Sequence, residues 1–195
     1  MTAAAQQVSM VRQLAKRSYH VARNLPDRLL HRRRHDEVRR QLSRKRAPRR
    51  ILVVCYGNVC RSPYLQAVLQ RELPEVVVNS AGFIGSDRAV PAQSLVISAE
   101  RGLDLSRFRS RPLTPDVVNA ADLIVVMDSA QAREIMRRFP VGRARIVVAG
   151  DLDPVFESSR AITDPWNRSG EVFAASFDRL DRCAAVLVSV FRRAN

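Results

Sequence analysis

Residues 51–63 read ILVVCYGNVCRSP, an apolar run rich in β-branched residues followed at once by a polar loop that ends in proline. The apolar run has the composition of a buried strand, and Pro63 is suited to the first turn of a helix. Cys55 and Arg61 therefore lie between a strand and a helix N-terminus. Backbone N–H groups and the helix dipole attract an oxyanion at such a junction, and the planar fork of Arg61 holds two oxygens at once. The stretch predicts an anion site that contains a thiol.

The same surroundings act on the thiol of Cys55. A neighbouring arginine and a helix N-terminus favour the thiolate, which is the reactive form of cysteine. Gly57 permits a close backbone approach, and Asn58 tolerates the positive φ that a cradle of N–H groups requires. Ser62 is placed to donate a hydrogen bond to the sulfur. We interpret Cys55 as a nucleophile, although a lone cysteine at a strand end is more often a small buried hydrophobe.

Histidine is absent from residues 51–195, because His20, His31 and His35 all precede them. A Cys-His pair, a Ser-His-Asp triad and zinc bound by histidine are therefore excluded from this part of the chain. We expect the thiol to be activated by loop, dipole and arginine, with no metal and no cofactor.

The pattern of residues 51–195 is that of an α/β domain. Short β-branched runs alternate with helical segments, which predicts βαβ crossovers and a parallel sheet. We expect a single three-layer domain, with a four-stranded parallel sheet flanked by helices on both faces and ligands at the carboxyl ends of the strands. The predicted strands are 51–55, 76–80, 122–127 and 144–149, and the predicted helices are 63–73, 92–101, 115–120, 130–139 and 170–191.

Residues 1–50 differ from the rest of the chain in charge. They contain 15 Lys and Arg against 3 Asp and Glu, whereas residues 51–195 contain 18 against 16. The formal net charge of +14 thus belongs mostly to this basic extension. Its pattern predicts a weak amphipathic helix over 1–24, a second helical stretch through Leu42 and a basic linker over 43–50. We place the domain boundary near Ala47, with the extension over 1–47 and the α/β domain over 48–195.

Composition excludes several classes of protein. No apolar run approaches the roughly 20 residues of a membrane-spanning helix, the N-terminus lacks the apolar core of a secretory signal, and three cysteines do not describe a disulfide scaffold. A cytoplasmic protein is the expectation. The extension has four interpretations: a solvated tail, a segment that binds an anionic membrane surface, an organelle-targeting peptide, or a nucleic-acid arm. The last is the least favoured, because Tyr19 is its only aromatic residue.

The loop resembles the signature of the low-molecular-weight protein tyrosine phosphatases, a hydrophobic strand followed by Cys-x-Gly-Asn-x-Cys-Arg-Ser-Pro. The resemblance covers nearly all of 51–195 and none of 1–50. It takes in Ser80-Ala81-Gly82, Ser110-Arg111, the run 122–128 and Asp164-Pro165. It implies a cofactor-free hydrolysis of phosphotyrosine through a cysteinyl-phosphate, in which Cys55 is the nucleophile and Arg61 binds the phosphate. The implied substrate-binding residues of the loop are Tyr56, Gly57, Asn58, Val59, Cys60 and Ser62.

A phosphate monoester also needs an acid for its leaving oxygen. The residues alone leave two candidates, Asp153 and Asp164, each followed by proline. The family pattern selects Asp164, because the family's acid lies in an Asp-Pro followed by an aromatic residue and a short polar stretch before the last helix, as in DPWNRSGEVF here. Pro165 is then a supporting residue, and Asp164 acts first as acid and then as base.

Further roles are implied by the same resemblance. Trp166 and Phe83 stand at the family's aromatic substrate walls, although the family more often has a small or aliphatic residue in place of Phe83. Val59 stands where relatives that prefer phosphoarginine have threonine, which favours phosphotyrosine. Ser80 matches a serine that stiffens the loop through Asn58.

The remaining cysteines bear on an alternative. Cys60 matches the family's partner for a reversible disulfide with Cys55 under oxidants, and we interpret Cys183 as a core residue. An arsenate reductase has a similar fold and loop but needs further cysteines. Cys183 has no partner thiol nearby in the sequence, and Pro63 fits the phosphatase pattern better.

Two expectations concern the natural substrate and an alternative function of another class. The pattern of Ser169, Glu171 and Phe173 after the Asp-Pro-Trp stretch resembles that of bacterial family members that act on tyrosine kinases of exopolysaccharide assembly. A binding module, in which the basic extension is the working part, is the alternative from another class.

Overall fold

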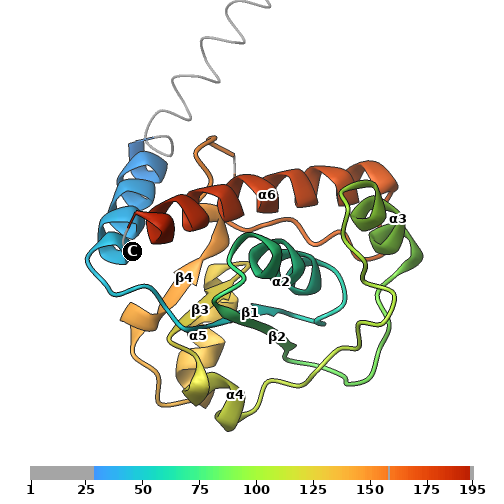
Figure 1. Cartoon of the computed structure of the whole chain (residues 1–195), viewed down its shortest axis with the longest axis horizontal. Coiled ribbons are helices and arrows are strands. Elements are labelled where there is room, and N and C mark those ends of the chain that lie inside the picture. The colour runs from blue at the N-terminus through green and yellow to red at the C-terminus, as the bar shows by residue number, and fades with distance from the viewer. Residues whose placement is uncertain (1–28, 158, 194–195) are drawn as a thin grey trace, which may run out of the picture.

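A computed structural model of the chain describes residues 29–157 and 159–193. Four parallel strands form one sheet in the order β2-β1-β3-β4, with helices on both faces (Figure 1). The predicted three-layer α/β domain is confirmed. The strands are β1 (Arg50–Cys55), β2 (Val77–Gly82), β3 (Leu123–Val126) and β4 (Ile146–Val148).

The strands arise from largely buried runs, as a parallel sheet under two helical layers requires, although Val77 at the start of β2 is exposed. All four residues of β3 are buried. The predicted strands are confirmed, with shifted ends. β4 is shorter than predicted because 3-10 turns, Arg143–Arg145 and Ala149–Asp151, flank it. β2 ends later than predicted because Ala81 and Gly82 continue the pairing with Val54 and Cys55 of β1, and Gly82 also forms a bridge to Pro112.

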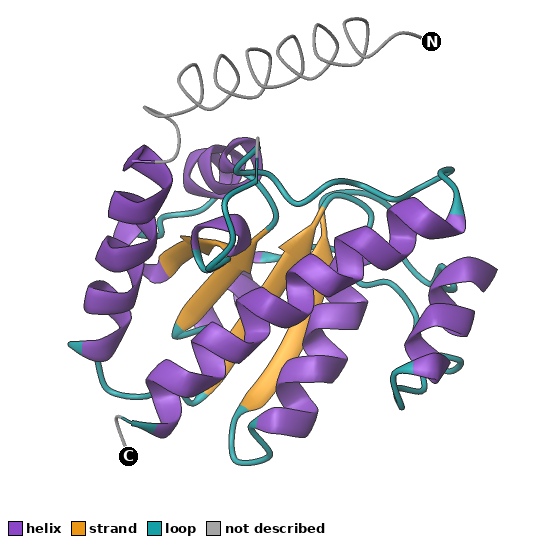
Figure 2. Cartoon of the chain, turned by 90° about the horizontal axis from the view of Figure 1, so that it is seen from above, coloured by secondary structure: helices purple, strands orange, loops and turns teal. Residues whose placement is uncertain are grey.

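Five helices follow the predicted ranges to within two residues. α2 (Arg61–Glu72) and α6 (Gly170–Arg192) cover one face of the sheet, with α3 (Ala92–Glu100) packed against α6. α4 (Pro115–Ala120) and α5 (Ser129–Arg138) cover the other face, which lies below the sheet in Figure 1. Figure 2 shows the long helix α6 lying across the strands. Thr114 and Asp128 cap α4 and α5 by accepting backbone N–H bonds, as residues of these types do at helix starts.

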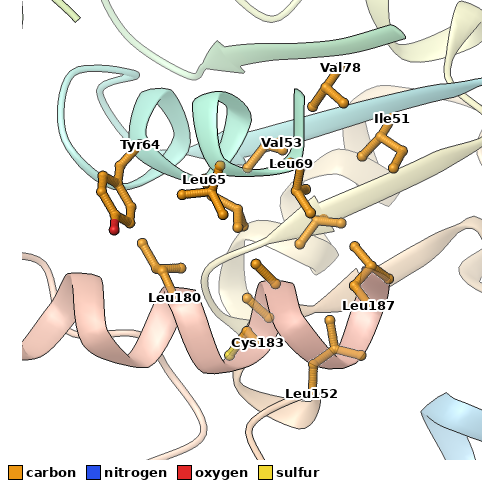
Figure 3. Packing of buried hydrophobic residues seen from close by; sticks show 14 of the residues in the cluster. Ile51, Val53, Tyr64, Leu65, Leu69, Val78, Leu152, Leu180, Cys183 and Leu187 are labelled. Atoms are coloured by element: carbon orange, nitrogen blue, oxygen red, sulfur yellow. The ribbon is translucent and has the colours of Figure 1, made fainter. Parts of the chain in front are cut away.

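The larger core lies between the sheet and α6. Side chains of α6 such as Leu180 and Leu187 face Val53 of β1 and Leu65 of α2 (Figure 3). Cys183 lies among them at 1% exposure, so its predicted place in the core is confirmed. Because this core fixes α6 against both β1 and α2, it also fixes the start of α2, where the arginine of the loop lies.

Residues 29–43 form a further helix, which contacts the chain on both sides of β4 (Figure 1). His35 contacts the carbonyl oxygen of Asp151 at 3.2 Å, and Gln41 donates to that of Ala144 at 2.8 Å. Leu42 is 2% exposed and belongs to the larger core. The predicted helical stretch through Leu42 is therefore confirmed, and this part of the extension packs on the domain.

The structure does not test two other predictions for the extension. The weak helix over 1–24, with Tyr19 and His20, lies outside the described residues. The boundary near Ala47 stays a prediction. In the described part of the chain, no helix is both long enough and apolar enough to cross a lipid bilayer.

Candidate active site

The loop 56–60 lies at the carboxyl end of β1, between that strand and α2. Cys55 is the last residue of β1 and pairs in register with Gly82 of β2. β1 is also the strand from which the sheet order runs to β2 on one side and to β3 on the other. Ligands of open α/β sheets bind at such a switch point.

Asn58 holds the loop in shape. Its φ is 50°, in the left-handed region, and its side chain is fully buried. The amide nitrogen donates to Ser62 Oγ at 2.9 Å and to Ser80 Oγ at 2.8 Å, and the amide oxygen accepts from the backbone N–H of Arg111 at 2.7 Å. Ser80 in turn donates to Gln66 at 2.6 Å. The amide therefore joins the loop to α2, β2 and the segment after α3.

Two donors point at the sulfur of Cys55. The backbone N–H of Asn58 lies 3.2 Å from Sγ, and the hydroxyl of Ser62 lies 3.0 Å from it. The residue itself is 2% exposed. The hydroxyl bond that the sequence predicts is present, and both bonds reach the atom on which a thiolate would carry its charge.

Arg61 is buried at the first turn of α2. It donates to the carbonyl oxygen of Ile162 at 3.0 Å and forms an ion pair with Asp164. Its Nε is buried and has no acceptor among the described residues. An oxyanion in the loop would supply that acceptor, since a buried donor without a partner is costly.

Both oxygens of the Asp164 carboxylate are in use. Oδ2 pairs with Arg61, and Oδ1 accepts from the backbone N–H of Trp166 at 3.2 Å. That second bond forms a turn of the Asx kind, and the carbonyl of Pro165 accepts from Arg168 within the same turn. The side chain of Asp164 remains 46% exposed, so substrate and water can reach it.

One small cavity of about 140 Å³ unites most of the predicted residues. It is lined by Cys55, Tyr56, Gly57, Val59, Cys60, Arg61, Ile84, Arg88, Asp164 and Trp166. Phe83 is not among them. It lines an adjoining groove of about 660 Å³ that shares Tyr56, Arg61 and Asp164 with the cavity, and the guanidinium of Arg138 lies 5.4 Å from its ring centroid. The structure thus brings Trp166 to the cavity and places Phe83 beside it.

Asp153, the other Asp-Pro candidate, is buried away from this cavity. It is fully buried and forms ion pairs with Arg179 at 3.0 Å and Arg182 at 2.8 Å. Burial acts to raise its pKa, but hydrogen bonds from Arg182, Val155 and Arg179 outweigh it, and the pKa is lowered. Asp153 is an ionised partner of two arginines and does not face the loop cavity.

Cys60 lies in the cavity wall as a neutral thiol. Burial, together with the charge of Cys55, raises the pKa of Cys60 to about 12. All three cysteines are free. Among the described residues, no group of three or more His, Cys, Asp or Glu side chains is arranged to hold a metal ion.

Two residues of the cavity, Arg88 and Ile84, were not predicted from the sequence. The guanidinium of Arg88 donates to the carbonyl oxygen of Gly57, and a Cβ at Gly57 would lie 2.6 Å from Arg88 Nη2. A side chain at position 57 would therefore displace the guanidinium of Arg88 from this carbonyl. No periodic pattern marks either residue, because both lie in the irregular segment after β2.

Comparisons with known proteins agree with this geometry. The sequence model of the family described as low molecular weight phosphotyrosine protein phosphatase matches residues 50–194. The chain is 40% identical over 134 residues to the probable low molecular weight protein-tyrosine-phosphatase EpsP of Ralstonia nicotianae, covering 68% of this chain and 88% of that protein. The chain therefore belongs to the low molecular weight protein tyrosine phosphatase family. It is an enzyme that hydrolyses phosphotyrosine in proteins, and the predicted resemblance is confirmed.

Solved structures show the same likeness. The tyrosine phosphatase AmsI of Erwinia amylovora is similar with a TM-score of 0.68 and 29% identity, over 73% of this chain and 92% of that one. The YwlE arginine phosphatase of Geobacillus stearothermophilus is similar with a TM-score of 0.68 and 28% identity, over 75% and 94%. The fold is thus shared by phosphatases of two substrate classes.

Proposed function

We propose that Cys55 is the nucleophile of this phosphatase, that Arg61 binds the phosphate, and that Asp164 is the general acid and base. The observation that carries the proposal is the single small cavity at the end of β1 that all three residues line. The sulfur there receives two hydrogen bonds, and Arg61 keeps one buried N–H without a partner in the described chain.

The reaction follows from this arrangement. The phosphate dianion enters the loop, binds Arg61 and displaces the Asp164 carboxyl from the guanidinium. The carboxylate of Asp164, released from Arg61, takes up a proton from solvent. The Cys55 thiolate attacks phosphorus, an S–P bond forms as the P–O bond to tyrosine breaks, and Asp164 gives that proton to the leaving phenolate oxygen. Asp164 then takes a proton from water, which attacks phosphorus and releases phosphate and the thiolate.

The walls of the cavity set the choice of substrate. Trp166 is half exposed on the cavity and offers an aromatic face to the phosphotyrosine ring. Val59 is buried beside Cys55 and presents no acceptor to a guanidinium, which favours phosphotyrosine over phosphoarginine. Phe83, in the adjoining groove, contacts the residues that flank the phosphotyrosine.

Trapping of the intermediate tests the proposed chemistry. The enzyme is mixed with a peptide that carries radiolabelled phosphotyrosine, denatured within milliseconds and digested. The label is expected on the peptide that contains Cys55, and it should persist in Cys60→Ser and vanish in Cys55→Ser. Label on any other residue would overturn the assignment.

We further propose that the phosphoprotein substrate is a tyrosine kinase of exopolysaccharide assembly, and that the enzyme acts in the cytoplasm. Ser169, Glu171 and Phe173 after the acid support the substrate, as does the 40% identity to EpsP. A thiol nucleophile needs the reducing compartment. The variant Asp164→Ala, used as a trap in extracts of the source cell, should retain such a kinase, and inorganic phosphate should release it. Retention of a different phosphoprotein would contradict the substrate.

For the basic extension we propose contact with an anionic membrane surface. The helix 29–43 buries Leu42 and turns its arginines outward, and the linker after it is equally basic. The exposed basic residues of this part are Arg32, Arg33, Arg39, Arg40, Arg44, Lys45, Arg46, Arg49 and Arg50. Basic side chains near an anionic surface contribute about 1 kcal/mol each.

Sedimentation with lipid vesicles tests this contact. The full chain should bind phosphatidylglycerol vesicles, and neutral phosphatidylcholine vesicles should not retain it. The variant Arg32→Gln/Arg33→Gln/Arg39→Gln should bind more weakly, and Arg137→Gln on α5 serves as a matched control. Equal binding to both vesicles, or binding only to an oligonucleotide, would contradict the proposal.

A further inference from the structure

The segment 159–164, which ends at Asp164, is held by side chains of other elements. Arg179 of α6 donates to the carbonyl oxygens of Ser159 and Ala161, at 2.7 and 2.8 Å. Ser176, one turn earlier on α6, donates to that of Thr163 at 2.9 Å. α6 therefore binds three carbonyls within the five residues that precede Asp164.

Arg179 lies in the interior of the protein. Its side chain is only 7% exposed, and its Nε donates to Asp153 at 3.0 Å. One edge of the guanidinium thus donates to a buried carboxylate, and its other nitrogens donate to the segment 159–164, called here the acid segment. Since the group is planar and its donors lie in a fixed fork, holding Asp153 fixes the direction in which the other two N–H groups point.

The turn at Gly150 also lies close to the segment. A Cβ at Gly150 would lie 2.0 Å from the carbonyl oxygen of Arg160 and 3.1 Å from Nη2 of Arg179. Asp151 forms an ion pair with the side chain of Arg160. The turn at Gly150 and the guanidinium of Arg179 therefore both border the segment near Arg160, and a side chain at position 150 would clash there with the backbone of the segment.

We propose that Arg179, oriented by Asp153, is a positioning residue that holds the general acid Asp164 in its place over the cavity. The inference rests on the proposed role of Asp164. Neither Arg179 nor Asp153 lines the cavity, so both act through the acid segment. A carboxyl that must give its proton to a leaving oxygen loses much of its effect when it is displaced by about 1 Å.

This arrangement has a consequence for mutagenesis. A variant of Asp153 would reduce acid catalysis, although Asp153 gives no proton, because Arg179 would lose its anchor. A loss of activity in Asp153 variants therefore does not identify Asp153 as the acid, and a readout that reports on proton transfer is needed.

Dependence on the leaving group is such a readout. Arg179→Lys keeps a positive charge beside Asp153 but lacks the fork that reaches two carbonyls. We expect kcat/KM to fall about tenfold for phenyl phosphate, whose leaving group needs the acid, and less than about twofold for para-nitrophenyl phosphate. The control is Arg182→Lys, since Arg182 binds the same Asp153 and also Glu157 but not the acid segment. It should leave the ratio of the two rates unchanged.

A double-mutant cycle decides whether the effect passes through the acid. In the background of Asp164→Asn, Arg179→Lys should cause no further loss for phenyl phosphate, because residues that act through one group are not additive. An additive loss, or equal losses on both substrates, would overturn the inference.

Two further outcomes are separable. If Asp164→Asn itself keeps the full rate on phenyl phosphate, the proposed role of Asp164 fails, whatever Arg179 does. If Arg179→Lys does not fold, Ser176→Ala removes one carbonyl bond at little cost in volume and should show the same selectivity for the poor leaving group, about threefold. A loss that is equal for both substrates in Ser176→Ala would count against the inference.

Discussion

Asn58 determines the form of the phosphate loop at the scale of single residues. Its positive φ turns the backbone N–H of Asn58 toward Cys55 Sγ, and its buried amide uses both ends to keep that turn in place. The sequence predicts this conformation, because asparagine is among the few residues that tolerate it. The acceptor role of Ser80 follows only from the family resemblance, and the bond to the N–H of Arg111 was not predicted.

Asp164→Ala should lower kcat/KM for phenyl phosphate by roughly 10²–10⁴-fold, the usual effect of general acid and base catalysis. Its carboxyl is half exposed, but its partner Arg61 is only 5% exposed, so the variant leaves a buried guanidinium without its carboxylate, which is destabilising. The melting temperature should therefore fall, and circular dichroism verifies that the protein assayed is folded. A rate within twofold of wild type, with phenyl phosphate as substrate, would contradict the role of Asp164.

A single helix can both pack in the core and bind a loop, and α6 is the clearest example. Its apolar stripe, which includes Phe173, Phe177 and Leu180, recurs at helical spacing, so the helix is predicted to within one residue of its end. Ser176 and Arg179 lie on the same buried side. In the sequence, hydrophobic periodicity shows these two residues only as polar positions within an apolar stripe. Their role could not be predicted, because the carbonyls that they bind belong to a loop whose conformation no local sequence pattern indicates.

The helix 29–43 joins the extension to the domain through its buried leucine. Leu42→Ala should lower the free energy of unfolding by about 2–4 kcal/mol, since a buried leucine leaves a cavity when truncated. The matched control is Leu29→Ala, because Leu29 is 53% exposed and should change stability by less than about 0.5 kcal/mol. Urea unfolding of both variants measures the difference. Equal midpoints would show that the helix is not packed on the domain.

The same packing bears on truncation. Turnover of a small substrate should survive removal of residues 1–47, because the loop cavity lies in the part that remains. The shortened chain loses Leu42 and the bonds to Ala144, so it should unfold at a lower urea concentration than the full chain. A complete loss of folding would show that the domain requires the helix.

At the scale of the whole molecule, the sheet order places the site. The alternation of strands and helices in the sequence predicts four parallel strands and three layers, and the structure has both. The ends of β2 and β4 were predicted less well, because the pairing of β2 with the last residues of β1 and two 3-10 turns decide them. The gathering of Cys55, Arg61 and Asp164 follows from the motif and the family pattern. The places of Arg88, Phe83 and Arg179 depend on tertiary packing that one sequence does not show.

The buried Asp153 makes the stability of the molecule depend on pH. Its pKa is lowered in the folded chain, so the stabilisation is complete above the unfolded value of about 3.9 and is lost as the pH falls through the folded pKa. Urea midpoints should therefore stay level above about pH 5 and drop progressively as the pH falls below about pH 4. Asp153→Asn should be less stable at pH 7, by about 3–5 kcal/mol, with a flatter profile below pH 5. The exposed Asp36→Asn is the control, and identical profiles for wild type and Asp153→Asn would contradict this account.

The central claim is that a thiol activated without histidine performs the chemistry, and turnover of a phosphotyrosine peptide by Cys55→Ser tests it most directly. The variant is compared with Cys60→Ser, which changes the neighbouring buried thiol, and circular dichroism verifies that both are folded. We expect no measurable release of phosphate by Cys55→Ser and substantial release by Cys60→Ser. Release by folded Cys55→Ser at the wild-type rate would contradict it.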